Sequence, residues 1–278
     1  MTVSDNRGDR LDPHTPQPAR RYNYWLGGKD NFAADRESGD AIAAVYPGVI
    51  AAARENHKFA GRAVRYLAAR HGIDQFLDVG PGLPTFNHTH DVAQQISPAA
   101  RIVYADNDPH VLVHARALLT GTNEGRIAYI DADLREPSSI LHADGLLHTL
   151  DLSRPVGLVL AAVLHFLPDE YAYSSVRALT EVLAPGSFLV LSHATYDLLP
   201  AGVRSALTSR NFPGKTGFTS RTRSQIGEFF ADLNLIRPGL TPVNRWRREL
   251  SSPTPSGSVA ILGGVAVKPG RCRDHIRR

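Results

Sequence analysis

The stretch that decides the fold is Phe76-Leu77-Asp78-Val79-Gly80-Pro81-Gly82, an apolar run that carries one acid and ends in two glycines. A second apolar run, Arg101-Ile102-Val103-Tyr104-Ala105-Asp106, ends on an acid 24 residues after Gly82. Both runs are typical of buried strands that end in polar or small residues. Glycines let the backbone approach a ligand closely, and a carboxylate after the second strand can accept hydrogen bonds from ribose hydroxyls. Together the two runs predict a crevice for a nucleoside cofactor.

The turn after the first run indicates which nucleoside fits. Gly80-Pro81-Gly82-Leu83-Pro84-Thr85 lacks the third glycine of the dinucleotide fingerprint G-x-G-x-x-G. Asp78 would repel a pyrophosphate but suits a ligand that carries an ammonium group. S-adenosylmethionine has an ammonium, a sulfonium and a ribose but no phosphate. The turn therefore favours S-adenosylmethionine and disfavours an NAD-dependent oxidoreductase.

Length and composition restrict the class of protein. The chain has 278 residues, which suits one large domain with small additions. Cys272 is the single cysteine, so an intramolecular disulfide and a cysteine metal cluster are excluded. Residues 1–20 lack the apolar core of a signal peptide, and the apolar run 156–164 is far shorter than the roughly 20 residues needed to cross a bilayer. We expect a cytoplasmic protein without membrane contact.

The positive charge is concentrated in the last third of the chain. Residues 201–278 hold 14 Lys and Arg against 4 Asp and Glu, whereas residues 1–200 hold 17 against 23. A basic segment of this kind can attract nucleic acid or an anionic substrate. The alternative, which we favour, is a solvated surface that continues into a basic tail.

Strand and helix patterns alternate through most of the chain. Strands are expected at 75–79, 101–105, 126–131, 156–163, 188–192, 236–246 and 259–268. Helices are expected at 37–71, 84–97, 108–121, 169–184 and 222–233. Right-handed crossovers then predict an α/β fold: a doubly wound, Rossmann-like sheet of seven strands with a terminal antiparallel pair. The pair would flank the Ser/Pro-rich loop 251–258.

Four regions are expected along the chain. Residues 1–19 are polar and proline-containing and read as a disordered tail, and residues 20–72 as an N-terminal lid or helical cap. Residues 73–268 form the cofactor-binding domain, and residues 269–278 a basic C-terminal tail.

With the strand ends in this order, residues 73–268 resemble the class I S-adenosylmethionine-dependent methyltransferases. Leu77 to Gly82 looks like the first motif of that family, and Leu183-Ala184-Pro185-Gly186-Ser187-Phe188 looks like the turn before its fifth strand. Pro84 stands where the family has a third glycine, which leaves the course of this loop open.

The resemblance implies cofactor-binding roles for residues at four strand ends. It places Asp78, Gly80, Pro81 and Gly82 at the methionine portion, Asp106 and Asn107 at the ribose, and Asp133 and Leu134 at the adenine. Ala162, at the end of the fourth strand, joins this cofactor-binding set.

A narrower resemblance covers essentially the whole chain. Residues 19–36, which contain Arg20-Arg21-Tyr22-Asn23-Tyr24-Trp25-Leu26-Gly27-Gly28-Lys29-Asp30-Asn31-Phe32, are similar to the N-terminal signature of a bacterial family called S-adenosyl methyltransferase. Residues 54–56, 106–109, 162–169 and 192–195 are similar to that family as well. We expect residues 19–36, with Tyr22 and Asn31 as cofactor contacts, to form a lid that excludes water. The alternative is that its aromatic rings simply pack on the sheet edge.

The chemistry at the acceptor is less defined. His165 and His193 follow the fourth and fifth strands and are candidate general bases, although a structural hydrogen bond is an equally ordinary role for each. The polar-Pro-Pro-aromatic sequence of many base-amine methyltransferases does not occur at 161–165. No metal-binding cluster stands out, since His88 and His90 do not share a helix face.

The predicted function is S-adenosylmethionine-dependent methyl transfer to a small-molecule acceptor. One alternative is an RNA or protein methyltransferase that uses the basic last third. Another is a binding protein that keeps the cofactor pocket without transfer. The sequence names neither the acceptor, nor the atom methylated, nor the oligomeric state, because fold and composition do not specify the shape of an acceptor pocket.

Overall fold

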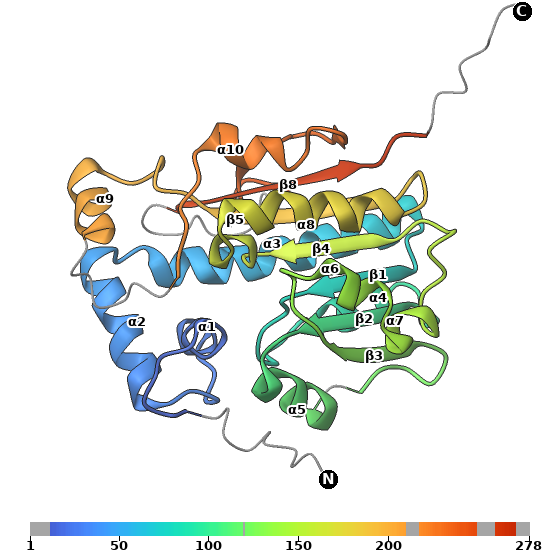
Figure 1. Ribbon diagram of the computed structural model, residues 1–278, viewed down its shortest axis with the longest axis horizontal. Coiled ribbons are helices and arrows are strands. Elements are labelled where there is room, and N and C mark those ends of the chain that lie inside the picture. Colours follow the sequence, from blue (N-terminus) through green and yellow to red (C-terminus); the bar gives the residue numbers. More distant parts are fainter. Residues whose placement is uncertain (1–11, 119, 210–216, 249–258, 271–278) are drawn as a thin grey trace, which may run out of the picture.

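The computed structural model describes residues 12–118, 120–209, 217–248 and 259–270, and a mixed β-sheet forms its centre (Figure 1). The strands are β1 (Gln75–Val79), β2 (Arg101–Asp106), β3 (Arg126–Asp131), β4 (Gly157–Ala161), β5 (Phe188–Ala194), β6 (Asn234–Leu235), β7 (Thr241–Pro242) and β8 (Ile261–Val267). Their order is β3-β2-β1-β4-β5-β8-β6, and β7 also pairs with β8. The first five strands are parallel and β8 runs antiparallel to β5. The predicted doubly wound sheet with an antiparallel end is confirmed.

Helices cover both faces of the sheet and one of its ends. They are α1 (Pro18–Leu26), α2 (Ala33–Val45), α3 (Val49–His71), α4 (Thr89–Gln94), α5 (Pro109–Leu118), α6 (Pro137–Leu141), α7 (Asp144–Leu147), α8 (Asp169–Val182), α9 (Ala201–Thr208), α10 (Arg223–Glu228) and the 3₁₀ turn η2 (Leu164–Phe166). In Figure 1, α3 lies behind the sheet and α8 in front of it, while α1, α2 and α9 lie beyond the end to which β4 points.

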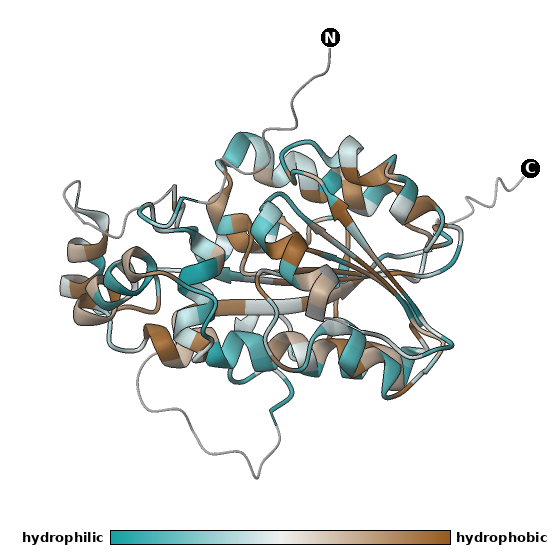
Figure 2. Cartoon of the chain, turned by 90° about the horizontal axis from the view of Figure 1, so that it is seen from below, coloured by the Kyte–Doolittle hydropathy of each residue, from teal (hydrophilic) through white to brown (hydrophobic). Residues whose placement is uncertain are grey.

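Two apolar cores hold these layers together. Alternation along β1 sends Leu77 and Val79 into the core shared with α6, α7, α8 and α10, and Phe76 into the core shared with α3 and α4. Figure 2 shows the strands as largely hydrophobic within surrounding helices of mixed hydropathy. Asp78 alternates with Leu77 and Val79 and therefore faces the α3–α4 side of the sheet.

Some predicted elements are shorter or interrupted. The helix expected at 37–71 is two helices, because Pro47 disfavours a helical conformation at Tyr46, the C-cap of α2. The strand expected at 236–246 is wrong: Pro238 and the left-handed Gly239 (φ 82°) interrupt it, and within this range only the two residues of β7 form a strand, which pairs with β8. The helix expected at 84–97 begins only at Thr89.

The N-terminal region contains a helix that the patterns above did not predict. Pro18 occupies the first turn of α1 and Gly27, with a φ of 88°, ends it in a left-handed cap. The expected tail at 1–19 therefore stops before Pro18, and its residues 1–11 lie outside the described residues. The expected loop 251–258, Cys272 and most of the basic tail at 269–278 also lie outside them.

Candidate functional site

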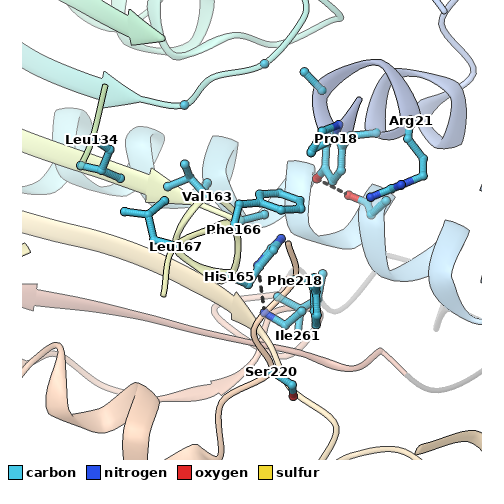
Figure 3. Close-up of a pocket in the computed structure, with 18 of the residues that line it drawn as sticks. Pro18, Arg21, Leu134, Val163, His165, Phe166, Leu167, Phe218, Ser220 and Ile261 are labelled. Atoms are coloured by element: carbon cyan, nitrogen blue, oxygen red, sulfur yellow. Dashed lines mark hydrogen bonds between the residues drawn. The ribbon is translucent and has the colours of Figure 1, made fainter. Parts of the chain in front are cut away.

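A cavity of about 1430 Å³ opens at the carboxyl ends of β1, β2, β3 and β4. This is where a doubly wound sheet binds its ligand, because the connections diverge there to opposite faces. The cavity continues beyond the strand ends, between α1, α2 and α3 on one side and α9 and the segment 218–222 on the other (Figure 3). It is larger than the roughly 300–1,000 Å³ of a typical small-ligand site.

The turn after β1 brings main chain to the cavity wall at two left-handed glycines. Gly80, with a φ of 71°, donates its N–H to the Ala105 carbonyl over 2.8 Å. A Cβ at Gly80 would lie 2.5 Å from Val163 Cγ2, so only glycine fits there. Gly82 has a φ of 70°, but a Cβ there would meet no atom within 4 Å. Pro81 lines the cavity between them. Gly82 thus presents bare main chain to an incoming ligand.

Asp106 lies at the end of β2 and faces the same cavity. Its Oδ2 accepts the Gly82 N–H at 3.3 Å and its Oδ1 accepts the Asp108 N–H at 3.0 Å. Burial raises the pKa of Asp106 to about 6, against the lowering effect of these two hydrogen bonds. The group is therefore an oriented carboxylate at neutral pH, with lone pairs left for further donors.

Asn107, Asp133 and Leu134 line the adjacent wall. Asn107 Nδ2 donates to Asp133 Oδ2 at 3.0 Å, and Arg135 forms an ion pair with the same carboxylate. Hydrogen bonds from the Arg135 side chain, with smaller contributions from its backbone and from Asn107, lower the pKa of Asp133 to about 2. The Asp133 oxygens are thus already engaged, and a ligand amine would have to compete with the largely exposed Arg135.

Ala162, which follows β4, has a left-handed conformation with a φ of 60°. Such a conformation costs a non-glycine residue roughly 1–2 kcal/mol and concentrates at functional sites. Two bonds hold its N–H, one to the Ser192 carbonyl at 3.1 Å and one to Ser192 Oγ at 3.0 Å. Ala162 lines the cavity beside Val163.

A hydrogen-bonded chain connects Ala162 to the N-terminal helix. Ser192 Oγ donates to Asn56 Oδ1 at 2.5 Å, and Asn56 Nδ2 donates to the Tyr22 hydroxyl at 2.9 Å. Tyr22 in turn donates to the Ala53 carbonyl at 2.8 Å. Every donor in the chain has an acceptor, and burial raises the pKa of Tyr22 so that its hydroxyl stays protonated. We call the chain Tyr22–Asn56–Ser192–Ala162 the relay.

Two predicted cofactor contacts lie outside the main cavity. Asp78 lines a small neighbouring cavity of about 60 Å³ with Gly80 and Pro81, where its Oδ2 accepts the Thr89 hydroxyl at 2.6 Å. Burial raises the pKa of Asp78 to about 7. Asn31 bonds through Nδ2 to Asn23 Oδ1 and to the Gly28 carbonyl, both at 3.0 Å, and does not line the main cavity.

The prediction that His193 faces the crevice is wrong. Its Nδ1 donates to the Ala194 carbonyl at 2.7 Å, and its Nε2 accepts from Arg221 Nη1 at 2.8 Å. Burial lowers the pKa of His193 to about 3, and the side chain is fully buried behind the cavity wall. Alternation along β5 sends His193 to the face opposite Ser192 and fixes it as a neutral structural residue.

His165, in contrast, lines the cavity (Figure 3). Its Nδ1 accepts the Ala194 N–H at 3.5 Å, which leaves the hydrogen of the neutral ring on Nε2. Burial lowers the pKa of His165 well below its usual range, and the neighbouring His193, Arg221 and Arg21 act in the same direction. His165 is therefore a neutral hydrogen-bond donor at neutral pH rather than a strong base.

Sequence reasoning gave no role to several residues that shape the cavity: Arg21, Asn56, Ser192 and Phe218. Asn56 offered a signal, because it is a polar residue in the otherwise apolar stripe of α3. Arg21 and Ser192 lie in segments that resemble the family, but these segments do not indicate their contacts, and no local pattern marks Phe218. Within the described ranges, no group of three metal-ligating side chains is found and no helix has the length and hydrophobicity to span a membrane.

The cavity fits S-adenosylmethionine on features of this structure. The bare main chain at Gly82 admits a nucleoside, the Asp106 carboxylate suits ribose hydroxyls, and several further acids suit a cation: Asp108, Asp131 and Glu136 in the main cavity and Asp78 behind the turn.

Comparisons with known proteins agree with this chemistry. A family model described as S-adenosyl methyltransferase matches residues 4–269. The crystal structure of a DUF574 family protein from Streptomyces avermitilis MA-4680 is 42% identical, with a TM-score of 0.86 over 93% of this chain and 99% of that chain. A candidate methyltransferase from Thermobifida fusca YX is 38% identical, with a TM-score of 0.84 over 97% of this chain and 100% of that chain. A search of curated proteins gives no match.

The family match spans nearly the whole described chain, and both of these relatives exceed one third identity along almost their full length. The fold and the cavity at the strand ends agree with it. The chain therefore belongs to the S-adenosyl methyltransferase family, whose enzymes use S-adenosylmethionine as cofactor.

Proposed function

We propose that this enzyme methylates a small-molecule acceptor, on oxygen, nitrogen or carbon, inside the cavity that continues past the strand ends. The observation that carries the proposal is the extent of the cavity beyond the strand ends. Beyond Gly82 and Asp106 the cavity extends between α1, α2 and α9, lined by side chains from all three helices. A recess of this kind suits a compact molecule better than a polymer, which needs an open track.

The cofactor would be held by residues at the four strand ends. Asp106 and Asn107 would bind the ribose hydroxyls, Leu134 would contact the adenine face, and Gly82 would allow main-chain approach to the methionine portion; all four line the cavity. Asp133 would accept from the adenine amine once Arg135 moves aside. Asp78 would attract the ammonium group from the small cavity behind Gly80 and Pro81.

Little acid–base chemistry is required of the chain. When bound, S-adenosylmethionine supplies a methyl group on a positively charged sulfur that is already a good leaving group. The residues need only align the acceptor and exclude water. The neutral His165 can orient an acceptor oxygen or nitrogen through its Nε2 hydrogen.

We propose that α1 and α2 form the lid over this cavity. Tyr22 and Trp25 line it, and the buried Arg20–Asp35 ion pair, with an Nε–Oδ2 distance of 2.8 Å, fixes α1 to α2. The proposed lid covers fewer residues than the cap expected at 20–72, since α3 packs along the sheet and is not part of it. Deleting residues 1–36 should weaken binding of S-adenosylhomocysteine in calorimetry, and unchanged affinity would refute the lid.

In the described part of the basic last third, three cations are engaged by neighbours within the fold. Arg221 is buried against Asp169, and Lys268 Nζ donates to three carbonyls at the end of α8. Arg247 lies 3.9 Å over the Tyr66 ring. These cations act within the fold, which supports the small-molecule proposal over an RNA acceptor.

The test is calorimetric titration with S-adenosylmethionine, S-adenosylhomocysteine and NAD, alongside Asp106→Ala. We expect the two S-adenosyl ligands to bind, NAD not to bind, and the variant to bind more weakly. Turnover of S-adenosylmethionine with pooled small metabolites but not with RNA would support the proposed acceptor class. Tight binding without turnover in any pool would instead indicate a binding protein.

A further inference from the structure

The part of the cavity beyond the strand ends differs in lining from the part at the glycine turn. We call it the acceptor chamber. Its walls come from α1, α2, η2, α9 and the segments after β5 and before α10. They are mainly apolar and aromatic: Trp25, Ile42, Phe166, Tyr196, Leu207 and Phe218. Such a lining binds a ligand with a substantial apolar body.

One wall of the acceptor chamber is a row of rings. Tyr196 and Phe218 stack at 5.7 Å between centroids with an interplanar angle of 22°. Phe218 lies 5.0 Å from the His165 ring, and His165 meets Phe166 edge-on at 4.4 Å. Flat rings in a row offer offset-stacked and edge contacts to another flat ring. The apolar body that this wall fits is therefore planar.

The charges that line the acceptor chamber are mostly positive. They are Arg20, which is paired with Asp35, together with Arg21, Arg204, Arg221 and one acid, Asp197. Arg221 is already satisfied by Asp169 and by the Leu164 and Leu167 carbonyls. Asp197 caps α10 by accepting the Arg223 N–H at 2.8 Å. Arg204 has no ion pair with a described residue, and its Nη2 makes one long contact, 3.4 Å, to the Leu199 carbonyl. The balance favours an anionic ligand.

Arg21 brings a buried charge to the wall of the chamber. The residue is 4% exposed, and its Nη1 donates to Ser38 Oγ at 3.0 Å. Figure 3 shows its side chain turning back from α1 and ending to the right of Phe166. Burial lowers the pKa of Arg21 to about 10, which the charge of Asp35 only partly offsets. A carboxylate would stabilise the charge of this buried guanidinium, because its two oxygens can accept two parallel N–H hydrogen bonds.

We propose that the acceptor is a planar aromatic carboxylate, whose ring lies against Phe166 and Phe218 and whose carboxylate is recognised by Arg21, with Arg204 at the outer side. The inference rests on the proposed function, because it names the substrate class of the same site. The neutral His165 then faces the ring substituents and donates to an oxygen or nitrogen there.

The test uses the protein loaded with S-adenosylhomocysteine and four probes: benzoate, salicylate, benzamide and benzylamine. Calorimetry should show benzoate and salicylate binding at least about tenfold more tightly than benzamide, with no binding of benzylamine. In Arg21→Gln the preference for the carboxylates should vanish, while affinity for S-adenosylhomocysteine stays within about twofold. Arg36→Gln, an exposed arginine that does not line the cavity, is the matched control and should leave all four affinities unchanged.

Arg204→Gln provides a second variant at an exposed position, in case Arg21→Gln unfolds. We expect it to weaken benzoate binding about threefold through lost long-range attraction. Equal binding of benzoate and benzamide, preference for benzylamine, or failure of both carboxylates to bind to protein saturated with S-adenosylhomocysteine would overturn the assignment. Failure to bind S-adenosylhomocysteine itself would count against the proposed function instead.

Discussion

The two parts of the cavity are built in different ways and carry opposite charge. The cofactor part is made by short turns directly after β1, β2 and β3, and its charged side chains are mostly acids. The acceptor chamber is made by α1, α2, η2, α9 and two further segments, and its charged side chains are mostly arginines. The first part depends on local backbone geometry, and the second depends on how distant segments pack.

This difference suggests which changes each part tolerates. A turn in which Gly80 has a left-handed φ and touches Val163 allows no added atom. The wall of the acceptor chamber is a set of side chains, so substitutions there change shape and charge without moving the main chain. Variants should therefore separate into those that abolish cofactor binding and those that redirect the acceptor.

The largest effect is expected from Gly80→Ala. The new Cβ would overlap Val163 Cγ2 in a conformation that L-residues avoid, so the turn must shift. We expect a loss of about 2–4 kcal/mol in the free energy of unfolding and on the order of 100-fold in affinity for S-adenosylhomocysteine. Denaturant unfolding and calorimetry measure the two.

Gly82→Ala is the matched control for that experiment. It shares the left-handed backbone but has no neighbour within 4 Å of the added Cβ, so it should cost only about 1 kcal/mol in stability. If both variants behave alike, backbone conformation alone matters, and the close approach to Val163 does not.

A smaller effect is expected from pH and from Asp106→Asn. Burial raises the pKa of Asp106 to about 6, so its carboxylate becomes protonated as the pH falls below about 6 and then loses acceptor strength. Affinity for S-adenosylhomocysteine should therefore fall from pH 7 to pH 5. Asp106→Asn should bind roughly tenfold more weakly at pH 7.

The pH dependence separates Asp106 from its acidic neighbour. Asp78, whose pKa burial raises to about 7, also titrates in this range, so Asp78→Asn should keep the part of the slope below pH 6. If the affinity of Asp106→Asn for S-adenosylhomocysteine still falls by the same amount from pH 7 to pH 5, another group controls cofactor affinity. Binding of probes in the acceptor chamber should depend little on pH in this range, since Asp106 and Asp78 lie in the other part.

The smallest effect is expected at the relay, where the two parts meet. Tyr22→Phe removes the hydroxyl that accepts from Asn56 and donates to Ala53, at a cost of about 1–2 kcal/mol in stability. We expect about threefold weaker cofactor binding, because Ala162 is held less firmly. Tyr24→Phe, on the same helix with its hydroxyl on the exposed Asp40, should change neither. Equal effects of the two variants would show that the relay does not connect α1 to the site.

Sequence reasoning predicted the first five strands because their signals are local. Continuous apolar runs, Asp108-Pro109 before α5 and the Thr222–Gln225 capping box all act within a few residues. It did not predict α1, the break at Pro47 within the helix expected at 37–71, or the interruption of the strand expected at 236–246. In the last two cases a proline or glycine outweighed the apolar pattern around it.

The site residues also divide into those that local signals predicted and those that depend on tertiary packing. Gly80, Pro81, Gly82, Asp106, Asn107, Asp133, Leu134 and Ala162 were predicted from strand ends, and all line the cavity, because the carboxyl ends of parallel strands meet at one edge. His165 and Tyr22 line it as well, while Asp78 lies behind the turn and Asn31 and His193 lie elsewhere. Alternation along β5 explains the position of His193, since adjacent residues of a strand face opposite sides of the sheet.

The sequence alone determined the sheet, the cofactor turn and its chemistry, because glycines, acids and apolar runs act through neighbours in the chain. Only the tertiary structure decided the relay between Tyr22 and Ser192, the burial of Arg21, and the chamber that Arg21 lines together with Phe166 and Phe218. Those features join segments up to about 200 residues apart, and such contacts form only when helices pack beyond the end of the sheet. The cofactor is therefore readable from motifs, whereas the acceptor is specified by packing.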